Sequence, residues 1–204
     1  LDRPVLVFGP PEIVAIWRQF CRMMRFDITI RMADEGRVPF AKMAQINIID
    51  AKTRDPIRLV DENDLTVSAM RNDHPPVFDS YALRFDEDGK SITFSGDTRY
   101  LPSLAGFAKN SDVLVHEAML AKGLDHVLAN TKTGDDRLKN HLLAAHSFAE
   151  QAGQIAAAAN VGHLVLNHLI PPERNICNDA DWRAETGRSF DGCCSVGHDG
   201  MAIE

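Results

Sequence analysis

Long apolar runs are missing from this chain, which nowhere has the roughly 18 consecutive apolar residues that a membrane-spanning helix needs. Dense basic runs are also missing, and 22 Lys and Arg against 29 Asp and Glu give a net charge of -7. An extended phosphate-binding surface is therefore not expected, and a small substrate is favoured over nucleic acid. With 45% hydrophobic and 25% charged residues, the 204 positions predict a single globular domain over 1–204 with a packed core.

Cysteine is scarce as well. The four cysteines lack the C-x-x-C spacing of a metal site and are too few for a disulfide scaffold. Cys21 is expected in the core. A disulfide from Cys177 to Cys193 or Cys194 remains an alternative if the protein lives outside the cytoplasm, because sequence alone does not give the distances between Cα atoms.

The order of apolar segments predicts a chain with strands first and mixed strands and helices later. Residues 4–9 form a short apolar run that ends in a turn, and a helix should follow from Pro11, because apolar residues then recur every three or four positions. Antiparallel strands are expected next, at 26–31, 46–50, 57–60, 65–70, 81–85 and 91–94. Helices at 101–109 and 148–160 then alternate with strands at 113–115 and 164–166, which indicates helices packed on a sheet.

One helix start is marked by side-chain chemistry. Ser147 is followed three residues later by Glu150, the pattern of a capping box, before an alanine-rich run. The helix should therefore begin near Ser147. His146 would then lie just outside its first turn, on a loop where its side chain can face a site.

Three polar residues follow predicted strands: His74, Asp97 and His168. Loops at one edge of a sheet can bring such residues together, and two imidazoles with a carboxylate are ligands that zinc accepts. Each also has an ordinary explanation when taken alone. These are an exposed loop histidine, an Asx turn and a histidine that bonds to backbone at a strand end.

Taken together, several motifs agree in order and spacing over nearly the whole chain. They are His74-Pro75-Pro76, Tyr81 to Phe85, Phe94-Ser95-Gly96-Asp97-Thr98-Arg99, Asp112 to Met119 with its His116-Glu117, Ala145-His146-Ser147, Leu164 to His168 and Gly197-His198-Asp199-Gly200-Met201. This combination resembles the metallo-β-lactamase fold, and within it the branch of ribonuclease Z and the arylsulfatase-like enzymes. The resemblance implies an α/β chain in an αβ/βα four-layer sandwich.

The resemblance also implies the roles of single residues. His74 would bind one zinc, Asp97 would bridge two zincs, and His168 would bind the second. Two Zn²⁺ ions per complete site lower the pKa of a shared water, so hydroxide exists at neutral pH. His146 would stabilise the transition state or protonate the leaving group. Glu117 would orient His146 or a metal-bound histidine, with a solvated loop glutamate as the equal alternative.

The remaining polar residues near these motifs are expected to be less important. His116 should be structural. Arg99 and Tyr100 either reach a substrate anion or, for Arg99, form a structural salt bridge. Surface or core positions are expected for His126, His141, His163 and His198. Of these, His141 is close enough to His146 in sequence to line the same pocket.

One signature of the family is missing, because His-x-His-x-Asp-His occurs nowhere in these residues. In the family this motif lies before the segment that resembles Pro4 to Pro10. Three explanations stay open: the chain is a fragment, another polypeptide supplies the missing half, or the site is degenerate. We favour a fragment, incomplete at the N-terminus, which should bind metal weakly or singly and be sticky or homo-oligomeric.

The first expectation for function is a zinc-dependent hydrolase of a small sulfate, phosphate or carboxylic ester. Alternatives are a tRNA 3′-end endonuclease, a β-lactam or lactone hydrolase, and a catalytically dead binding domain. The acidic balance and the lack of a Gly/Pro-rich basic arm argue against tRNA, and no membrane partner is expected. Relatives in the arylsulfatase-like branch suggest a periplasmic or secreted protein, with the cytoplasm as the alternative.

Overall fold

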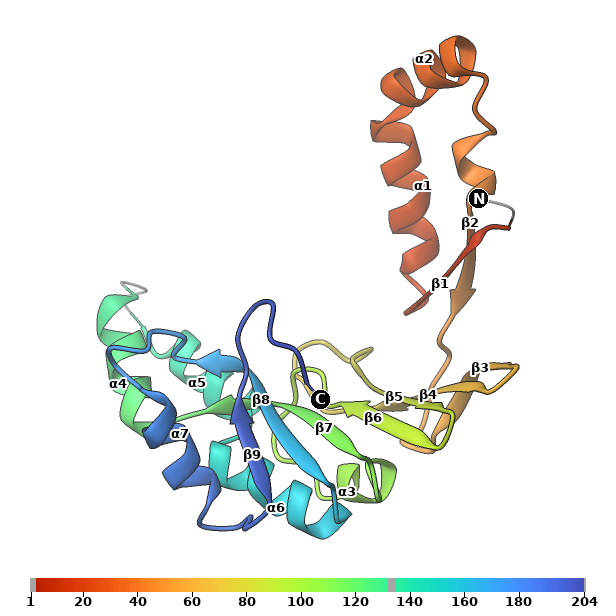
Figure 1. Ribbon diagram of the computed structural model, residues 1–204. Coiled ribbons are helices and arrows are strands. Elements are labelled where there is room, and N and C mark those ends of the chain that lie inside the picture. Colours follow the sequence, from red (N-terminus) through yellow and green to blue (C-terminus); the bar gives the residue numbers. More distant parts are fainter. Residues whose placement is uncertain (1–2, 132–134, 204) are drawn as a thin grey trace. The chain divides into compact units, whose positions relative to one another are not determined.

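The computed structural model describes residues 3–131 and 135–203, and the chain divides into two compact units, 1–52 and 53–204 (Figure 1). The single domain expected over 1–204 stays a prediction. No helix among the described residues has the length and apolar character needed to cross a membrane.

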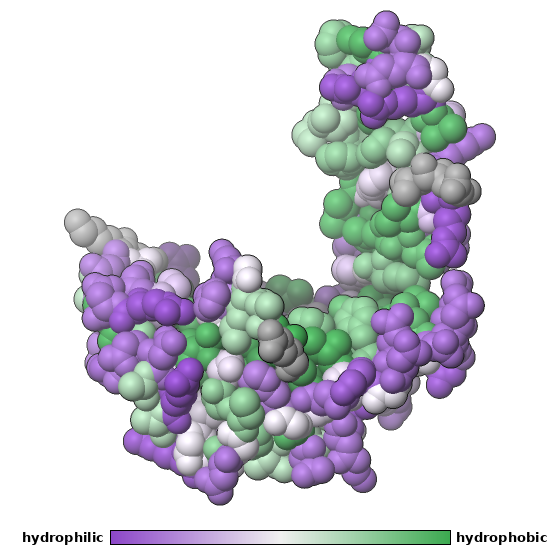
Figure 2. All heavy atoms as spheres, in the orientation of Figure 1, coloured by the Kyte–Doolittle hydropathy of each residue, from purple (hydrophilic) through white to green (hydrophobic). Residues whose placement is uncertain are grey.

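The first unit pairs two parallel strands, β1 (Val5–Gly9) and β2 (Ala44–Ile48), and carries α1 (Ile13–Met23), α2 (Arg25–Glu35) and the short 3-10 helix η1 (Phe40–Lys42). The rings of Trp17, Phe20 and Phe40 pack together, with centroids 5.4–6.1 Å apart. Other apolar side chains lie on the surface of α1, among them Ile16 and Met23 (Figure 2). A chain that associates with itself needs exposed apolar groups of this kind. That this chain is sticky or oligomeric stays a prediction.

The strand predicted at 26–31 is wrong, because this segment lies in α2. Its β-branched residues suggested a strand. In the structure Arg31 forms ion pairs four residues away on both sides, with Asp27 and Glu35, and such pairs stabilise a helix. Gly36, at φ 64°, ends the helix in the left-handed conformation that glycine adopts readily.

The second unit is built on a seven-stranded sheet in sequence order β3 to β9. The strands are β3 (Ile57–Glu62), β4 (Leu65–Arg71), β5 (Tyr81–Glu87), β6 (Lys90–Phe94), β7 (Val113–Met119), β8 (His163–Ile170) and β9 (Cys193–Val196). Pairing is antiparallel from β3 to β6 and parallel from β6 to β9. The predicted antiparallel strands are thus confirmed for β3 to β6, whereas the strand predicted at 46–50 belongs to the first unit as β2.

Helices pack against one face of this sheet (Figure 1). They are α3 (Leu104–Phe107), α6 (Ala149–Ala159) and α7 (Asp179–Thr186), with α4 (Ala121–Asn130) and α5 (Arg137–Ala145) near the end of β8. The core between sheet and helices includes Leu114, Leu164, Ile155 and Trp182, all at most 2% exposed. Small alanines along α6 allow this close approach.

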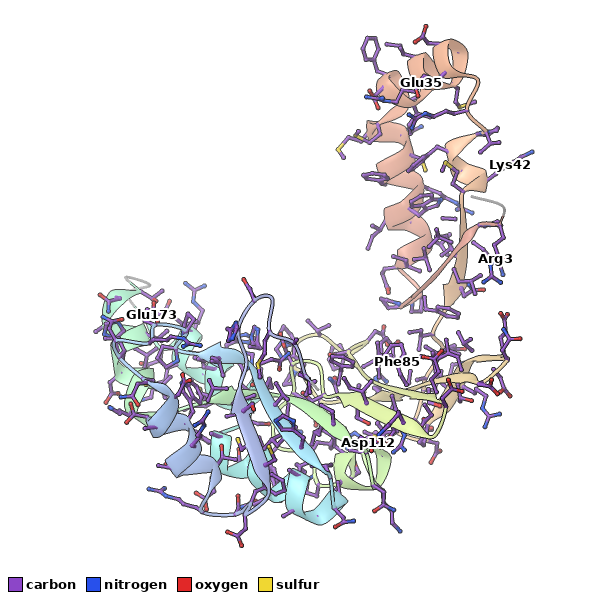
Figure 3. All side chains as sticks on the ribbon, in the orientation of Figure 1. Arg3, Glu35, Lys42, Phe85, Asp112 and Glu173 are labelled. Carbon is purple, nitrogen blue, oxygen red and sulfur yellow. The ribbon has the colours of Figure 1, made fainter. Side chains whose placement is uncertain are left out.

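The opposite face of the sheet bears an apolar groove of about 720 Å³. Side chains alternate between the two faces of a strand, so Phe85 and Ile92 lie on this face while their neighbours face the helices. Phe85 and Asp112, both labelled in Figure 3, line the groove. None of the histidines discussed above lines it.

All four cysteines are free thiols. The alternative disulfide from Cys177 to Cys193 or Cys194 is therefore not formed in the structure. Burial raises the pKa of the Cys177 thiol, which keeps it protonated and unreactive.

Candidate active site

Strand direction brings the predicted site residues to one edge of the sheet. β4 runs antiparallel to β5, and β5 antiparallel to β6, so β4 points the same way as β6, β7 and β8. His74 follows β4 and Asp97 follows β6, while His168 lies near the end of β8. The carboxyl ends of strands that share a direction meet at one edge, where sites of open α/β sheets form.

A tight turn holds Asp97. Gly96 has φ 60°, and a Cβ atom there would lie 2.7 Å from the carbonyl oxygen of Tyr81, so only glycine fits. The side-chain amide of Asn72 donates to the carbonyl oxygens of Ser95, at 2.7 Å, and of Asp97, at 3.2 Å. Asn72 thus holds the loop on both sides of Gly96, while the Asp97 side chain stays 40% exposed.

His168 is positioned by an irregularity in β8. The register between β7 and β8 shifts at this residue, since Asn167 pairs with Glu117 and Leu169 with Ala118. His168 is therefore the extra residue of a β-bulge, and its φ of 42° lies in the left-handed region that histidine rarely adopts. Bulges redirect side chains, and here Nε2 of His168 comes within 3.5 Å of Oδ2 of Asp97.

Glu117 and His146 form a buried acid–histidine pair. Glu117 lies inside β7 and is 0% exposed, which excludes the alternative of a solvated loop glutamate. Nδ1 of His146 donates to Oε1 of Glu117 at 3.1 Å, and the same oxygen accepts the backbone N–H of Thr98 at 2.8 Å. The second oxygen, Oε2, is buried with no hydrogen-bond partner, which is costly unless another group uses it.

This pairing changes the pKa of His146. Burial lowers the pKa, but the hydrogen bond to Glu117 and the negative charges of Glu117 and Asp97 raise it by more, so the net shift is upward. His146 is thus suited to carry a proton near neutral pH. Since Oε1 of Glu117 binds the Nδ1–H, the Nε2 atom of His146 is the one left to face the site.

His146 lies between two helices, at the end of α5, and the capping box predicted at Ser147 is wrong. The following helix begins at Ala149, and the backbone N–H of Phe148 donates to the side chain of Gln151 at 2.9 Å. Ser147 is fully buried, and its hydroxyl donates to the carbonyl oxygen of Thr98 at 2.7 Å. Ser147 therefore ties the His146 loop to the Asp97 loop.

His74 faces the same space. Its Nδ1 bonds to the carbonyl oxygen of Ala145 at 3.1 Å, which leaves Nε2 available. The centroid of its ring lies 5.2 Å from that of His146, which in turn stacks on the ring of His168 at 5.4 Å. The structure thus brings His74, His146 and His168 together, with Asp97 beside His168.

A fourth imidazole, His141, joins this cluster, although the sequence predicted a surface or core position for it. It lies on α5, with its ring centroid 5.8 Å from His74 and 5.7 Å from His146. Ligand atoms of His74, His141 and His146 all lie within 4.8 Å of one another. Two features of the sequence indicate this position for His141. It is close to His146 in the chain, and Leu138 and Leu142 form one apolar face of a helix that also carries His141.

The other polar residues have structural roles. His116 is buried, its Nδ1 bonds to the carbonyl oxygen of Glu117 at 2.7 Å, and burial lowers its pKa. Arg99 bonds to the carboxylate of Asp73 at 2.9 Å, which favours a structural salt bridge over a substrate contact. Two of the remaining histidines bond to side chains near them: His126 to Asn130 on α4, and His163 to Ser195.

Comparison with known proteins places this geometry in context. A family model described as beta-lactamase superfamily domain matches residues 20–169. Ribonuclease Z of Mycobacterium tuberculosis (strain ATCC 25177 / H37Ra) is 27% identical over 201 residues, which make up 98% of this chain and 69% of that protein.

Solved structures agree on the fold. The short form of human tRNase Z superposes with a TM-score of 0.58 at 18% identity, over 99% of this chain and 68% of that one. Zn²⁺-bound PqqB from Methylobacterium extorquens gives a TM-score of 0.62 at 15% identity, over 98% of this chain and 65% of that one. The expected mixed α/β class with the metallo-β-lactamase fold is thereby confirmed.

Proposed function

The chain belongs to the beta-lactamase superfamily, and within these metallo-β-lactamase-fold hydrolases we propose that it cleaves RNA phosphodiester bonds at the 3′ end of precursor tRNA. The observation that carries the proposal is the 27% identity to a ribonuclease Z across 98% of this chain. The relatives named above support a nucleic acid substrate over the small sulfate or carboxylic ester that the sequence led us to expect first.

The acidic net charge, which argued against nucleic acid, is not uniform along the chain. Residues 1–52 contain eight Lys and Arg against six Asp and Glu, so the excess of negative charge lies entirely in the second unit. Electrostatic attraction of RNA depends on such local excesses as well as on net charge. The first unit is therefore the part of this chain better suited to contact a phosphate backbone.

The side chains at the sheet edge fit zinc. His74 has its Nδ1 occupied by the carbonyl oxygen of Ala145, as is typical of histidines that bind a metal through Nε2. Asp97 and His168 add a carboxylate and a second imidazole, and both are part exposed. Zinc held by His74, Asp97 and His168 would lower the pKa of a water molecule and neutralise charge on the phosphodiester. Zinc and these ligand roles are part of the proposal.

His146 and Glu117 would handle the proton. When water attacks phosphorus, the bond from phosphorus to a ribose oxygen breaks, and that oxygen needs a proton to leave as a hydroxyl group. His146 can donate it from Nε2, while Glu117 holds the Nδ1–H and stabilises the charged ring. The upward shift of the pKa of His146 keeps a larger fraction of the ring protonated near neutral pH.

The test is cleavage of a precursor tRNA with a 3′ extension by the full chain in Zn²⁺, beside bis-p-nitrophenyl phosphate and p-nitrophenyl sulfate. We expect cleavage at the 3′ end and hydrolysis of the phosphodiester, with both lost in D97N and H146A. His126→Ala serves as a matched control, since that histidine lies on α4 with Asn130 as its partner.

Two outcomes would contradict the proposal. One is hydrolysis of the sulfate ester with both phosphodiesters left intact. The other is tRNA cleavage that persists unchanged in D97N and H146A, which would trace the activity to a contaminating nuclease.

A further inference from the structure

His141 has no part in the function proposed above, yet it faces two residues that do. The rings of His74, His141 and His146 form a triangle with centroids 5.2–5.8 Å apart, and their ligand atoms lie within 4.8 Å of one another. Three neutral imidazoles with a fourth position open to water are a common ligand set for a divalent transition metal.

Two of the three rings are already oriented as metal ligands are. His74 donates its Nδ1–H to the carbonyl oxygen of Ala145, and His146 donates its Nδ1–H to the carboxylate of Glu117. Carbonyl and carboxylate partners of this kind fix the tautomer and leave Nε2 as the electron-pair donor. Both support groups come from well-buried positions, since Ala145 and Glu117 are 0% exposed.

His141 is held on a rigid element beside them. It lies on α5, where the next residue, Leu142, is buried against Met119 and Leu124. The same helix provides the carbonyl oxygen of Ala145 that orients His74. Because His141 itself is partly exposed, its ring can turn toward an ion that enters from solvent.

We propose that His74, His141 and His146 form a binding site for one divalent transition-metal ion. Zinc bonds to histidine nitrogen at about 2.0–2.1 Å, so nitrogens around one tetrahedral ion lie about 3.3 Å apart. The ligand atoms, which lie within 4.8 Å of one another, must therefore approach by up to about 1.5 Å, which rotation of the side chains can supply. Imidazole suits Zn²⁺, Co²⁺, Ni²⁺ and Cu²⁺ rather than Mg²⁺ or Ca²⁺, which prefer oxygen.

The site differs from the ligand set of the proposed function in two of three residues, and its existence does not depend on that function. An ion bound at this site would nevertheless affect the proposed hydrolysis. An ion there occupies Nε2 of His146, the atom proposed to donate the proton, and competes for His74. Metal in excess of what hydrolysis needs should therefore inhibit.

The experiment is titration of the metal-free full chain with Co²⁺, followed by visible absorption, and with Zn²⁺ by calorimetry. Wild type should show binding of an ion whose protein ligands are nitrogen atoms. H141A and H146A should weaken binding at least about tenfold, because loss of a ligand costs no less than the 10–100-fold that loss of its supporting partner costs. The control H126A should leave this binding unchanged.

A rescue variant keeps the test independent of folding. In H141C a thiolate replaces the imidazole, so Co²⁺ should still bind and add a near-ultraviolet sulfur-to-metal band. Circular dichroism should show that each variant is folded. Binding that survives H141A and disappears in D97N or H168A would overturn the three-histidine site, and so would a Co²⁺ complex of H141C without a sulfur band. If the wild-type chain binds Co²⁺ as expected but does not cleave precursor tRNA, that result would count against the proposed function alone.

Discussion

Replacing Glu117 with glutamine tests the acid–histidine pair directly. The variant keeps the shape of the side chain, and its carbonyl oxygen can still accept from Thr98 and His146. What it loses is the negative charge next to the His146 ring. Hydrogen bonds to charged groups contribute about 1.5–3 kcal/mol. Neutral hydrogen bonds contribute about 0.5–1.5 kcal/mol, so the protonated His146 ring should lose about 1–1.5 kcal/mol of stabilisation in E117Q, and the pKa of His146 should fall.

The consequence for hydrolysis follows from that shift. Where the reaction needs a protonated His146, the alkaline limb of the pH–rate profile should move to lower pH. The rate above neutral pH should then fall by about 5–10-fold, since about 1.4 kcal/mol corresponds to a factor of ten in the protonated fraction. The measurement is the profile of phosphodiester hydrolysis, together with NMR titration of the His146 ring.

The Glu117–His146 pair also makes the free energy of unfolding depend on pH. The pKa of His146 is raised in the folded chain, so the folded state binds its proton more tightly than the unfolded state does. This contribution is fully present below about pH 6.5, the value for an exposed histidine, and is lost as pH rises through the folded pKa. In E117Q that pH-dependent part of the free energy of unfolding should shrink.

A matched control is Glu150→Gln on α6, because the nearest charge to Glu150 is Arg188 at 3.9 Å and it does not contact the site. E150Q should leave the pKa of His146 and the pH–rate profile as in wild type. An unchanged NMR pKa of His146 in a folded E117Q protein would refute the reasoning.

Three further predictions concern the fold around the site. Gly96→Ala should destabilise the fold more than Gly36→Ala. Both glycines have positive φ, which costs alanine about 1–2 kcal/mol. Only at Gly96 would the added Cβ atom also clash, with the carbonyl oxygen of Tyr81 at 2.7 Å. Urea unfolding measures this, and equal losses would contradict the clash. His168→Gly should abolish hydrolysis yet leave the free energy of unfolding equal or higher, because it relieves a left-handed histidine; a large loss would show that no strain is stored there. Reaction with a thiol reagent in denaturant, without reductant, should count four free thiols, and two would indicate the alternative disulfide.

Much of the second unit could be predicted because its signals are local. The strands from β3 to β6 alternate in hydrophobicity and are separated by Gly, Asn and Asp turns, so their positions and antiparallel order follow from pattern alone. The convergence of His74, Asp97 and His168 could also be expected, because each follows or ends a strand. What these patterns do not contain is the bulge at His168, which depends on the pairing of β8 with β7.

Elsewhere, contacts that the local pattern does not indicate decide the structure. Ser147 has the sequence context of a helix cap, yet its hydroxyl bonds to the carbonyl oxygen of Thr98 in another loop, and Gln151 caps the helix instead. Ile28 and Ile30 favour a strand, yet α2 is stabilised by ion pairs along its surface. The contact of Ser147 is tertiary, whereas the ion pairs of α2 are local and join residues four positions apart on the same helix.

The sequence allows two roles for Glu117, a solvated glutamate or a partner of His146, and the surroundings of this side chain in the structure favour the second. A glutamate that follows Val113-Leu114-Val115-His116 is compatible with a strand end in water or with a buried charge, and only the groups around it distinguish these two cases. Here β8 covers one side of β7, the Thr98 loop donates an N–H, and His146 arrives from the turn between α5 and α6. A carboxylate buried this deeply is tolerated because it is paired and hydrogen-bonded. Because its Oε1 atom bonds to Nδ1 of His146 while Oε2 has no hydrogen-bond partner, the His146 ring is the group that balances its negative charge when that ring is protonated.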